Sequence, residues 1–363
     1  MVQLSDLHIR IHKAIKQHHL LPKGSRIVMG ISGGQDSLCM MHILHDLTAL
    51  WNWRLHVLHC NHRWIASEAD CADFAIAQAK ALQLPHAVAT APHIYRDENR
   101  ARQWRYDMFC DWAQQWNCQY VVTAHTGSDR AETFLFNLCR GSGADGLANI
   151  KWSRPLHPHL TPSPKSPVHG DPALRGDPPT GETPTTPEEL SPLLTLVRPL
   201  LEVWRHETLD FCQTRSFPIW EDPFNQDLSH PRNRIRQELV PFLKAHFNPQ
   251  VELALTRTAD ILASQSEDIS DRSKTLMLQA YRENPPRLDC RHLGKASVAL
   301  QRQAIRQFLS MHALSSQFEQ VETLRSLLNA PHRSRTPSLT GGVWAEINQG
   351  YLVLYSDKTT VSG

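Results

Sequence analysis

The sequence lacks several features that mark well-known protein classes. Its eight cysteines contain no C-x-x-C pair, which argues against a zinc or iron–sulfur site and predicts reduced thiols in a cytoplasmic protein. No G-x-x-x-x-G-K-[ST] motif occurs, so a Walker A site is excluded. No window is apolar and long enough to span a membrane. The net charge of +2 excludes a basic field over the whole molecule, so any surface that binds nucleic acid must be local.

What the 363 residues do contain is an alternation of strand and helix patterns, with enough length for two domains. The predicted strands are Ile27–Ile31, Leu55–His59, His86–Thr90 and Tyr120–Ala124, and the helices between them are Leu38–Leu50, Ser67–Leu84 and Asn99–Gln115. This order predicts an α/β fold with a doubly wound, Rossmann-like parallel sheet. In such sheets ligands bind beyond the carboxyl ends of the strands.

The composition changes between residues 155 and 192, where eleven of the 24 prolines lie and no Phe, Trp or Tyr occurs. Such a segment buries too little apolar surface to offset its ordering entropy, so we predict a disordered insertion in the first domain. A buried-strand pattern returns at Leu194–Leu200.

Helical patterns dominate from Arg232 to Leu328, and Val343–Ile347 and Tyr351–Tyr355 form a predicted C-terminal β hairpin. We therefore expect a first domain over residues 1–218 and a mainly helical second domain over residues 219–363.

Directly after the first predicted strand the chain reads SGGQDS. Glycines let the backbone approach an anion closely, and the N–H groups that open the next helix point toward it. The segment predicts a phosphate-binding loop made of Ser32, Gly33, Gly34, Gln35, Asp36 and Ser37. A tight strand-to-helix turn without a ligand is the alternative. The order of strand, loop and helix favours nucleotide binding.

A second cluster follows the strand at Tyr120–Ala124. If a helix begins near Ser128, then Asp129 and Glu132 project from one face of its first turn, with His125 just ahead. The carboxylates can hold a cationic amine, orient a metal-bound phosphate or accept a proton. Acids in a first helical turn also act as caps, and this alternative stays open.

Three groups of arginines are candidate phosphate contacts. Arg102 and Arg105 share one helical face and can clamp phosphates of ATP or of a nucleic acid, although a solvated basic face is the alternative. Arg140 follows a helix with Gly-Ser-Gly, which is first of all a C-cap and can also face an anion. Arg232 and Arg236 lie four apart on a basic helix that fits contacts to a phosphate backbone, although such helices are common.

Together these segments resemble the tRNA(Ile)-lysidine synthetase family of the ATP-pyrophosphatase, or PP-loop, superfamily. SGGQDS alone indicates only the superfamily. The specific match adds Asn61 to Arg63, Glu98 to Tyr106, His125 to Gly143, Arg198 to Leu201, Trp220 to Asn225 and Arg232 to Arg236. The resemblance covers most of residues 20–245, and residues after about 250 match poorly, as in a compact form of the family.

This chain departs from the family pattern at two places. Thr126, Ser128 and Arg130 stand where the family has His, Asp and Gln, and Asn61-His-Arg-Trp replaces the usual Asp-His-x-Leu-Arg. The first departure leaves His125 and both acids in place, so the resemblance still implies activity, with a changed geometry for the lysine.

What the resemblance implies is a two-step ligation. ATP adenylates the C2 carbonyl oxygen of the wobble cytidine in an isoleucine tRNA with a CAU anticodon, releasing pyrophosphate. The ε-amine of free L-lysine then attacks C2, and AMP leaves. The product reads AUA instead of AUG, and the identity of the tRNA changes from Met to Ile.

The resemblance also implies roles for the candidate residues. The loop would hold pyrophosphate, with Asp36 placing Mg²⁺ against it. Asp129 and Glu132 would grip lysine, with His125 nearby for ATP or proton transfer. Arginines would stabilise charge on phosphates or contact tRNA; they are Arg102, Arg105, Arg140, Arg198, Arg232 and Arg236. No membrane partner is expected, and a second copy of the chain is a further candidate partner.

Two rival functions remain. A tRNA cytidine thiolase of the same fold would be expected to carry paired C-x-x-C ligands, which this chain lacks. A non-catalytic nucleotide-binding module would need the loop but would have no use for Asp129, Glu132 or a basic helical domain.

Overall fold

The computed structural model describes residues 4–64, 68–95, 97–148, 150–157, 194–220, 223–339, 342–356 and 359–360. The chain forms two compact units, Met1–Ala259 (unit 1) and Asp260–Gly363 (unit 2). Most of the predicted Pro-rich insertion, residues 158–192, lies outside the described residues.

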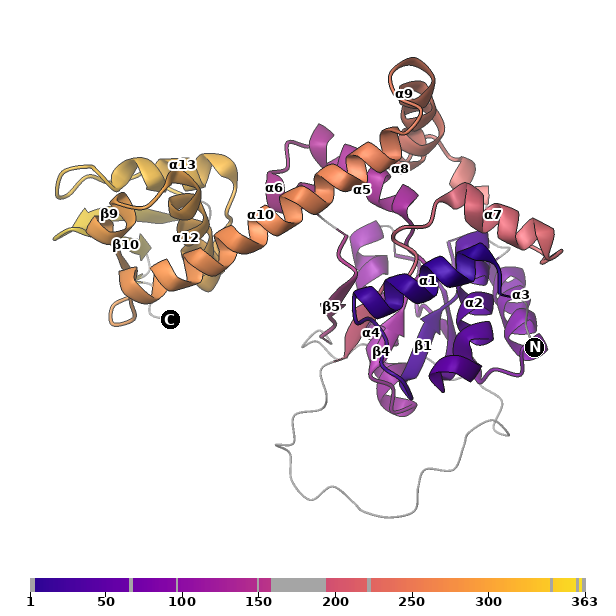
Figure 1. Ribbon diagram of the computed structural model, residues 1–363. Helices are drawn as coiled ribbons and strands as arrows, with labels where there is room; N and C mark the ends of the chain where they lie inside the picture. Colours follow the sequence, from indigo (N-terminus) through magenta and orange to yellow (C-terminus); the bar gives the residue numbers. More distant parts are fainter. Residues whose placement is uncertain are drawn as a thin grey trace, which may run out of the picture. The chain divides into compact units, whose positions relative to one another are not determined.

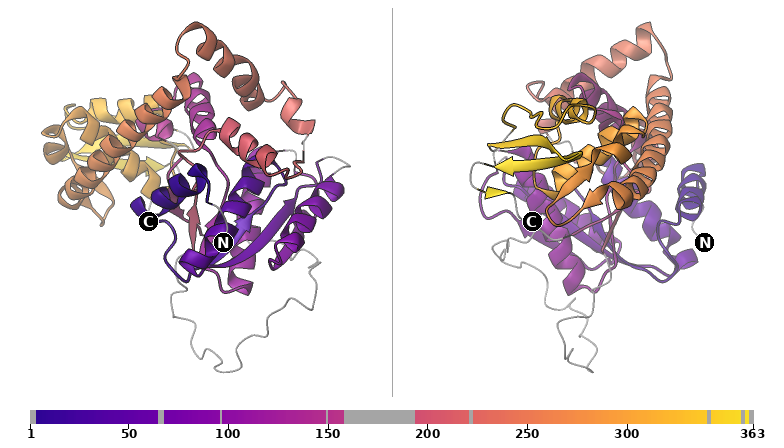
Figure 2. Two further views of the ribbon diagram at one scale, coloured as in Figure 1. Left: turned by 45° about the vertical axis from the view of Figure 1, so that its right-hand side comes forward. Right: turned by 90° about the vertical axis from the view of Figure 1, so that its left-hand side faces the viewer.

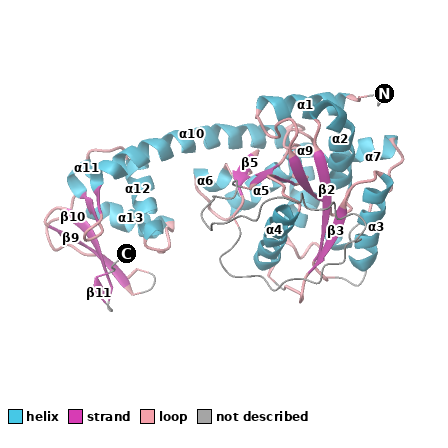
Figure 3. Cartoon of the chain, turned by 90° about the horizontal axis from the view of Figure 1, so that it is seen from below, coloured by secondary structure: helices cyan, strands magenta, loops and turns pink. Residues whose placement is uncertain are grey.

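Unit 1 alternates strands and helices in the predicted way (Figures 1 and 3). Its first elements are α1 (Asp6–Gln17), β1 (Arg26–Gly30), α2 (Gln35–Trp51), β2 (Arg54–Asn61), α3 (Glu68–Ala81), β3 (His86–Thr90), α4 (Glu98–Gln115), β4 (Tyr120–Val122) and α5 (Gly127–Cys139). They are followed by α6 (Ala144–Leu147), β5 (Ser153–Pro155), β6 (Thr195–Val197), α7 (Arg205–Thr214), the 3-10 helix η2 (Pro223–Gln226), α8 (Pro231–Arg234), the π-helix η3 (Ile235–Leu239), α9 (Val240–His246) and α10 (Val251–Ala280), which continues into unit 2.

The sheet of unit 1 has the order β3-β2-β1-β4-β6-β5. All neighbouring pairs are parallel except β5 and β6, which are antiparallel. The doubly wound parallel sheet is therefore confirmed. The strand order reverses between β1 and β4, and a crevice at such a switch point is where open α/β sheets bind ligands.

Helices cover both faces of the sheet. Successive side chains of a strand point to opposite faces, so one strand packs in both layers. In β1, Ile27 and Met29 pack in one buried cluster with residues of α1, α2, α3 and α7. Val28, between them, packs in a second cluster with residues of α4. Continuous apolar runs such as the one in β1 follow from burial on both faces.

His42 of α2 is a buried titratable group beside the first of these clusters. Its ring stacks on Phe217 with centroids 3.7 Å apart, and its Nε2 has no hydrogen-bond partner in the described part of the chain. Burial lowers the pKa of His42 to about 4. The unfolded chain binds a proton near pH 6.5 and the folded chain does not. Stability from neutral His42 is therefore fully present above about pH 6.5 and is lost as the pH falls toward 4.

His42→Phe should reduce the acid sensitivity of unit 1, because phenylalanine keeps the stacked ring and does not titrate. Between about pH 6 and pH 4.5, the free energy of unfolding of the wild type should fall about 1.4 kcal/mol per pH unit more steeply than that of the variant. Urea unfolding across this pH range measures both slopes. Equal slopes would show that His42 titrates normally in the folded protein.

The helices α8, η3 and α9 belong to unit 1. Ile235 and Val240 form a buried cluster with Leu135 of α5, which explains why the compact unit extends to Ala259. The boundary expected at 218/219 rested on the change from mixed to helical patterns, and that change does not mark where packing ends.

Unit 2 combines helices with a small antiparallel sheet (Figure 2). Besides the end of α10 its elements are β7 (Tyr281–Arg282), β8 (Arg287–Asp289), α11 (Cys290–Gly294), α12 (Val298–Met311), α13 (Phe318–Leu327), β9 (Val343–Asn348), β10 (Tyr351–Ser356) and β11 (Thr359–Thr360). The predicted hairpin is confirmed as β9 and β10. The sheet is larger than predicted, because β8 and β11 also pair with β10 and β7 pairs with β8. Among the described residues of the chain, no helix is long and apolar enough to cross a membrane.

Candidate active site

The SGGQDS segment forms the turn between β1 and α2. Gly33 has a φ of +86°, a conformation that residues with a side chain rarely adopt. The turn is internally bonded: the Ser37 hydroxyl donates to the carbonyl of Gly34 at 2.8 Å and accepts from the backbone N–H of Ser32 at 3.2 Å. The loop is therefore held in shape by its own groups.

The first turn of α2 is open to a ligand. Its N-cap is Gly34, and no side chain caps the helix. The free N–H groups at the start of a 17-residue helix and the positive end of its dipole attract an anion. The phosphate-loop prediction thus has the expected local geometry.

Gly33→Ala should impair this loop. Besides the positive φ, a Cβ at Gly33 would lie 3.3 Å from Sγ of Cys71, 3.3 Å from Cβ of Trp220 and 3.4 Å from Phe74. We expect a loss of about 1–3 kcal/mol in the free energy of unfolding from backbone strain and a raised KM for ATP.

Gly141→Ala is the matched control, because Gly141 also has a positive φ, of +73°, but has open space around a Cβ. Thermal melting and the KM for ATP compare the two variants. If both raise the KM for ATP equally, the effect does not come from the phosphate loop.

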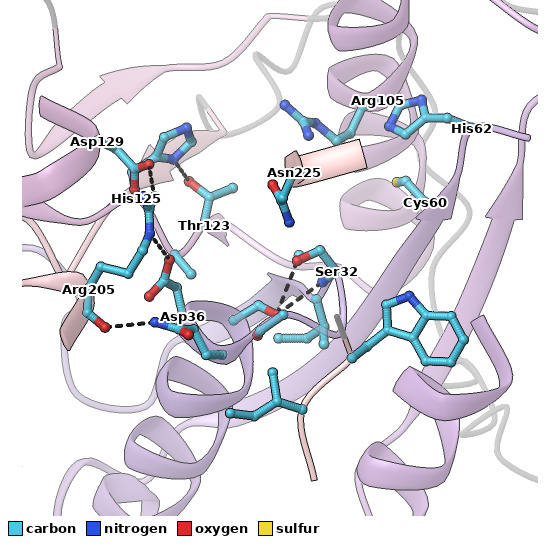
Figure 4. Close-up of a pocket in the computed structure, with 18 of the residues that line it drawn as sticks. Ser32, Asp36, Cys60, His62, Arg105, Thr123, His125, Asp129, Arg205 and Asn225 are labelled. Carbon is cyan, nitrogen blue, oxygen red and sulfur yellow. Dashed lines mark hydrogen bonds and ion pairs between the residues drawn. The ribbon is translucent and has the colours of Figure 1, made fainter. Parts of the chain in front are cut away.

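Three carboxylates from two helices, α2 and α5, meet around one guanidinium. Arg205, the first residue of α7, lies beside Asp129 and Asp36 (Figure 4). It donates to Oδ1 of Asp129 at 2.7 Å, and its Nε lies 3.5 Å from Oδ2 of Asp36. It also donates to Oε1 of Glu132 at 2.7 Å. Asp36 also accepts a hydrogen bond from the hydroxyl of Thr208. The acids that follow β1 and β4 therefore belong to a single cluster.

Asp129 both caps α5 and faces this cluster. Its Oδ2 accepts from the backbone N–H and the hydroxyl of Thr126, each at 2.8 Å, which completes a capping box. Its Oδ1 is left for Arg205. Asp129 is therefore both a helix cap, as one interpretation predicted, and a member of the carboxylate cluster, as the other predicted. The departure at Ser128 also has a role, because its hydroxyl accepts from the backbone N–H of Arg205 at 3.3 Å.

Arg236 reaches the same cluster from the π-helix η3. Its Nε and Nη2 donate to Glu132 at 2.9 and 3.0 Å, and its Nη1 lies 3.4 Å from Oδ1 of Asn225. Ile235 of η3 lies in a buried cluster, while the next side chain, Arg236, extends to Glu132.

Burial and Arg205 set the charge of the acids. Burial raises the pKa of Asp36, and the positive charge of Arg205 opposes this only in part. Burial also disfavours the charged form of Asp129, but Arg205 and the bonds from Thr126 hold the pKa of Asp129 below its ordinary value. The neighbouring carboxylates raise the pKa of Arg205.

Two neutral histidines stand beside the acids. Burial, and then Arg198, lowers the pKa of His125 to about 3. Burial, and then Arg105, lowers the pKa of His62 to about 3. His125 is oriented by Thr123, whose hydroxyl lies 3.0 Å from its Nδ1. Both imidazoles are therefore uncharged at neutral pH and weak as bases.

These groups line two adjoining cavities in unit 1. The first, of about 730 Å³, contains the loop and Asp36. The second, of about 720 Å³, contains most of the arginines. Five residues line both and define the junction; they are His62, Arg105, His125, Asp129 and Arg236.

The structure brings together most of the predicted site residues. The first cavity is lined by Ser32, Gly34, Gln35, Asp36 and Ser37, and the second by Arg102, Glu132, Arg198 and Arg232, besides the junction. The side chain of Gln35 points to α7, where it donates to the carbonyl of Arg205 at 2.7 Å.

Arg140 does not join the site. Its guanidinium lies 5.1 Å from the ring centroid of Phe136, and it lines a separate groove. The physical reason is the length of α5, which at about 1.5 Å per residue places its C-terminal end about 20 Å from its start. The prediction that Arg140 stabilises charge on phosphates or on the tRNA therefore concerns a surface outside the two cavities and stays a prediction.

Sequence reasoning missed Arg205. A single arginine before His-Glu carries no local signal, and the only available indication was its place shortly after the Arg198 to Leu201 segment of the family resemblance. In the part of the chain that the structure describes, no group of three or more His, Cys, Asp or Glu is arranged to hold a metal ion.

The fold and the loop define a nucleotide-binding protein of the PP-loop class. Residues 4–243 match the PP-loop domain family. The fold is also similar to that of the U34-tRNA thiolase NcsA from Methanococcus maripaludis, with a TM-score of 0.51 and 15% identity over 70% of this chain and 78% of that one. At this identity the likeness concerns the fold alone.

Similar proteins with known names identify one family within the PP-loop class. The chain is 44% identical over 358 residues to a tRNA(Ile)-lysidine synthase of Synechococcus sp. (strain JA-2-3B'a(2-13)), covering 98% of this chain and 100% of that one. It is 41% identical over 336 residues to the tRNA(Ile)-lysidine synthase of Synechocystis sp., covering 92% and 93%. The chain belongs to the tRNA(Ile)-lysidine synthase family.

Proposed function

We propose that this protein is an AMP-forming ligase that joins free L-lysine to C2 of the wobble cytidine in an isoleucine tRNA with a CAU anticodon. The observation that carries the proposal is the junction of the two cavities. A phosphate loop lies on one side, arginines lie on the other, and a carboxylate cluster lies between them. The names of relatives 35–44% identical to the chain agree with this activity.

In the first step, the C2 carbonyl oxygen of cytidine attacks the α-phosphorus of ATP, and the bond to the β-phosphate breaks. The open first turn of α2 and the N–H groups of the loop would hold the leaving pyrophosphate. Arg105 lines both cavities and has no carboxylate partner among the described residues, so its charge is available to the reacting phosphate.

The carboxylate of Asp36 would hold Mg²⁺ against the pyrophosphate. Mg²⁺ is commonly bound by one or two carboxylates together with substrate phosphates and water, so a single acid beside the loop fits it. When bound, the ion would neutralise charge on the leaving group. Burial and Asp129 both raise the pKa of Asp36, and a nearby cation opposes this, as Arg205 does.

In the second step, the ε-nitrogen of lysine attacks C2 and the bond to the AMP oxygen breaks. The carboxylates have room for an ammonium group, because a carboxylate oxygen can accept two hydrogen bonds. Among the described residues, Oδ1 of Asp129 accepts one, from Arg205, and Oε2 of Glu132 accepts one, from Arg236. The amine, with a reference pKa of about 10.4, must lose a proton before it attacks. We assign lysine binding to Asp129 and Glu132.

Incubation of the protein with ATP, labelled lysine and the CAU-anticodon isoleucine tRNA tests the proposal. Nucleoside analysis should show label in one modified cytidine, with AMP and pyrophosphate formed in equal amounts. The methionine tRNA with the same anticodon triplet is the matched control and should take up no label. AMP release without lysine in the nucleoside would contradict the proposal. Light scattering tests separately whether a second copy of the chain is a partner.

A further inference from the structure

Four arginines that line the second cavity converge on one buried tyrosine, Tyr106. The Cζ atoms of Arg154, Arg102 and Arg105 lie 4.9, 5.5 and 5.8 Å from the ring centroid of Tyr106. The Tyr106 hydroxyl accepts a hydrogen bond from Nη2 of Arg102 at 3.2 Å, and the charge of Arg198 also acts on the phenol. These arginines come from α4, β5 and the segment after β6, so the ring is where three elements meet.

None of these four arginines is paired with a carboxylate in the described part of the chain. Arg198 is only 4% exposed, its Nη1 donates to the carbonyl of Lys151 at 2.7 Å, and its Nε has no partner. Burial of a guanidinium without a carboxylate is unfavourable unless another group supplies negative charge. Tyr106 supplies electron density to the cluster, through its ring for Arg102, Arg105 and Arg154 and through its hydroxyl oxygen for Arg102.

The charge of Tyr106 itself responds to the cluster. Burial alone would raise the pKa of its phenol, but Arg102, Arg105 and Arg198 together lower that pKa to about 8. Tyr106 therefore faces a surplus of positive charge that its own electrons offset only in part.

The rest of the second cavity also carries more positive than negative charge. Seven cationic side chains line it against three carboxylates: Arg102, Arg105, Lys151, Arg154, Arg198, Arg232 and Arg236 against Glu98, Asp129 and Glu132. Two of the carboxylates, Asp129 and Glu132, are already bonded to Arg205 or Arg236. An anionic ligand with more than one charge fits this surface.

We propose that Arg102 and Arg154 bind phosphodiester groups of the RNA strand that carries the target base, and that Tyr106 is the positioning residue that aims them. Arg198 lies buried beneath them and adds charge. The proposal rests on the proposed function for the identity of the RNA. The nucleotide triphosphate is the other possible source of phosphate, but the loop that suits it lines the first cavity.

The role of the ring follows from electrostatics. Guanidiniums held this close repel one another, and each long side chain has several rotamers. The electron-rich face of Tyr106 attracts Arg154 and Arg102, and its hydroxyl fixes the direction of Arg102. Without the ring the arginines would spread, and fewer would reach the same phosphates.

Tyr106→Leu and Tyr106→Phe test the proposal, because the first removes ring and hydroxyl and the second only the hydroxyl. tRNA-dependent ATP–pyrophosphate exchange gives KM for tRNA and for ATP, and tRNA affinity is measured over a series of salt concentrations. Tyr106→Leu should raise the KM for tRNA about tenfold and reduce the salt slope by about 0.7–0.9 for each phosphate that the arginines no longer neutralise. Tyr106→Phe should fall between Leu and wild type.

KM for ATP should change less than about twofold in both variants. Tyr120→Phe is the control, since it removes a hydroxyl at the opposite end of β4 from the site and should leave both KM values and the salt slope unchanged. A raised KM for ATP with unchanged tRNA binding would overturn the proposal, because the arginines would then serve the triphosphate. An unchanged salt slope would show that Tyr106 only packs in the protein and does not position the arginines. If lysine is not incorporated by the wild type, the proposed function fails, while the salt slope still tests the phosphate site.

Discussion

Asp36→Asn should abolish tRNA-dependent ATP–pyrophosphate exchange, with a loss of about 10³-fold in turnover. The amide keeps the shape of the side chain but removes the charge beside the phosphate loop, where the carboxylate accepts from Thr208 and faces Arg205. Affinity for tRNA should stay within about twofold, because the arginines of the second cavity do not contact Asp36.

Asp46→Asn is the matched control for Asp36→Asn. Asp46 lies on the same helix and is paired with His8 and Arg215, at 3.0 Å each, but it lines neither cavity. This control should lose stability and keep exchange activity. If Asp36→Asn retains exchange, or if it weakens tRNA binding as much as exchange, then Asp36 serves the structure of the loop and not the leaving group.

Arg205→Ala should have the second largest effect. It leaves Asp36, Asp129 and Glu132 together without the guanidinium that links them. Removal of one partner from a largely buried ionic cluster destabilises by about 3 kcal/mol. We also expect turnover to fall at least about 10²-fold, because the acids are no longer fixed in position by a shared partner. Asp36 would also become easier to protonate, since Arg205 is the positive charge that opposes the effect of burial.

Arg215→Ala separates these two effects. Arg215 follows the last residue of the same helix, its side chain is 28% exposed against 25% for Arg205, and it pairs with Asp46 away from both cavities. Chemical unfolding should show a comparable loss of stability in the two variants, with activity lost only in Arg205→Ala. Full activity of a folded Arg205→Ala protein would show that the carboxylate cluster is not the catalytic centre.

Contiguous signals made the fold of unit 1 predictable. β1, SGGQDS and α2 follow one another in the chain, and their order alone gives a strand, a phosphate loop and a helix. The same holds for β4 and the acids of α5, where spacing placed Asp129 and Glu132 near one another. β7 and β8 were missed because strands of two and three residues show no alternation of apolar and polar residues.

The carboxylate cluster could be predicted only in part, because its members are distant in sequence. Arg205 lies 169 residues from Asp36, and its contact depends on how α7 packs on α2. The same limit explains Arg140: a helix C-cap shows where a helix ends but not which way its end points. The roles assigned to the site residues stay predictions that the variants above test.

The central claim is that the loop after β1 holds the departing pyrophosphate while AMP is transferred to an RNA base. A structure with bound non-hydrolysable ATP analogue tests it most directly. The account predicts the β- and γ-phosphates against the backbone N–H groups of Ser32 to Ser37, and the α-phosphate at the junction beside Arg105 and His125. A triphosphate bound in the second cavity, with the loop making no contact to it, would contradict the account.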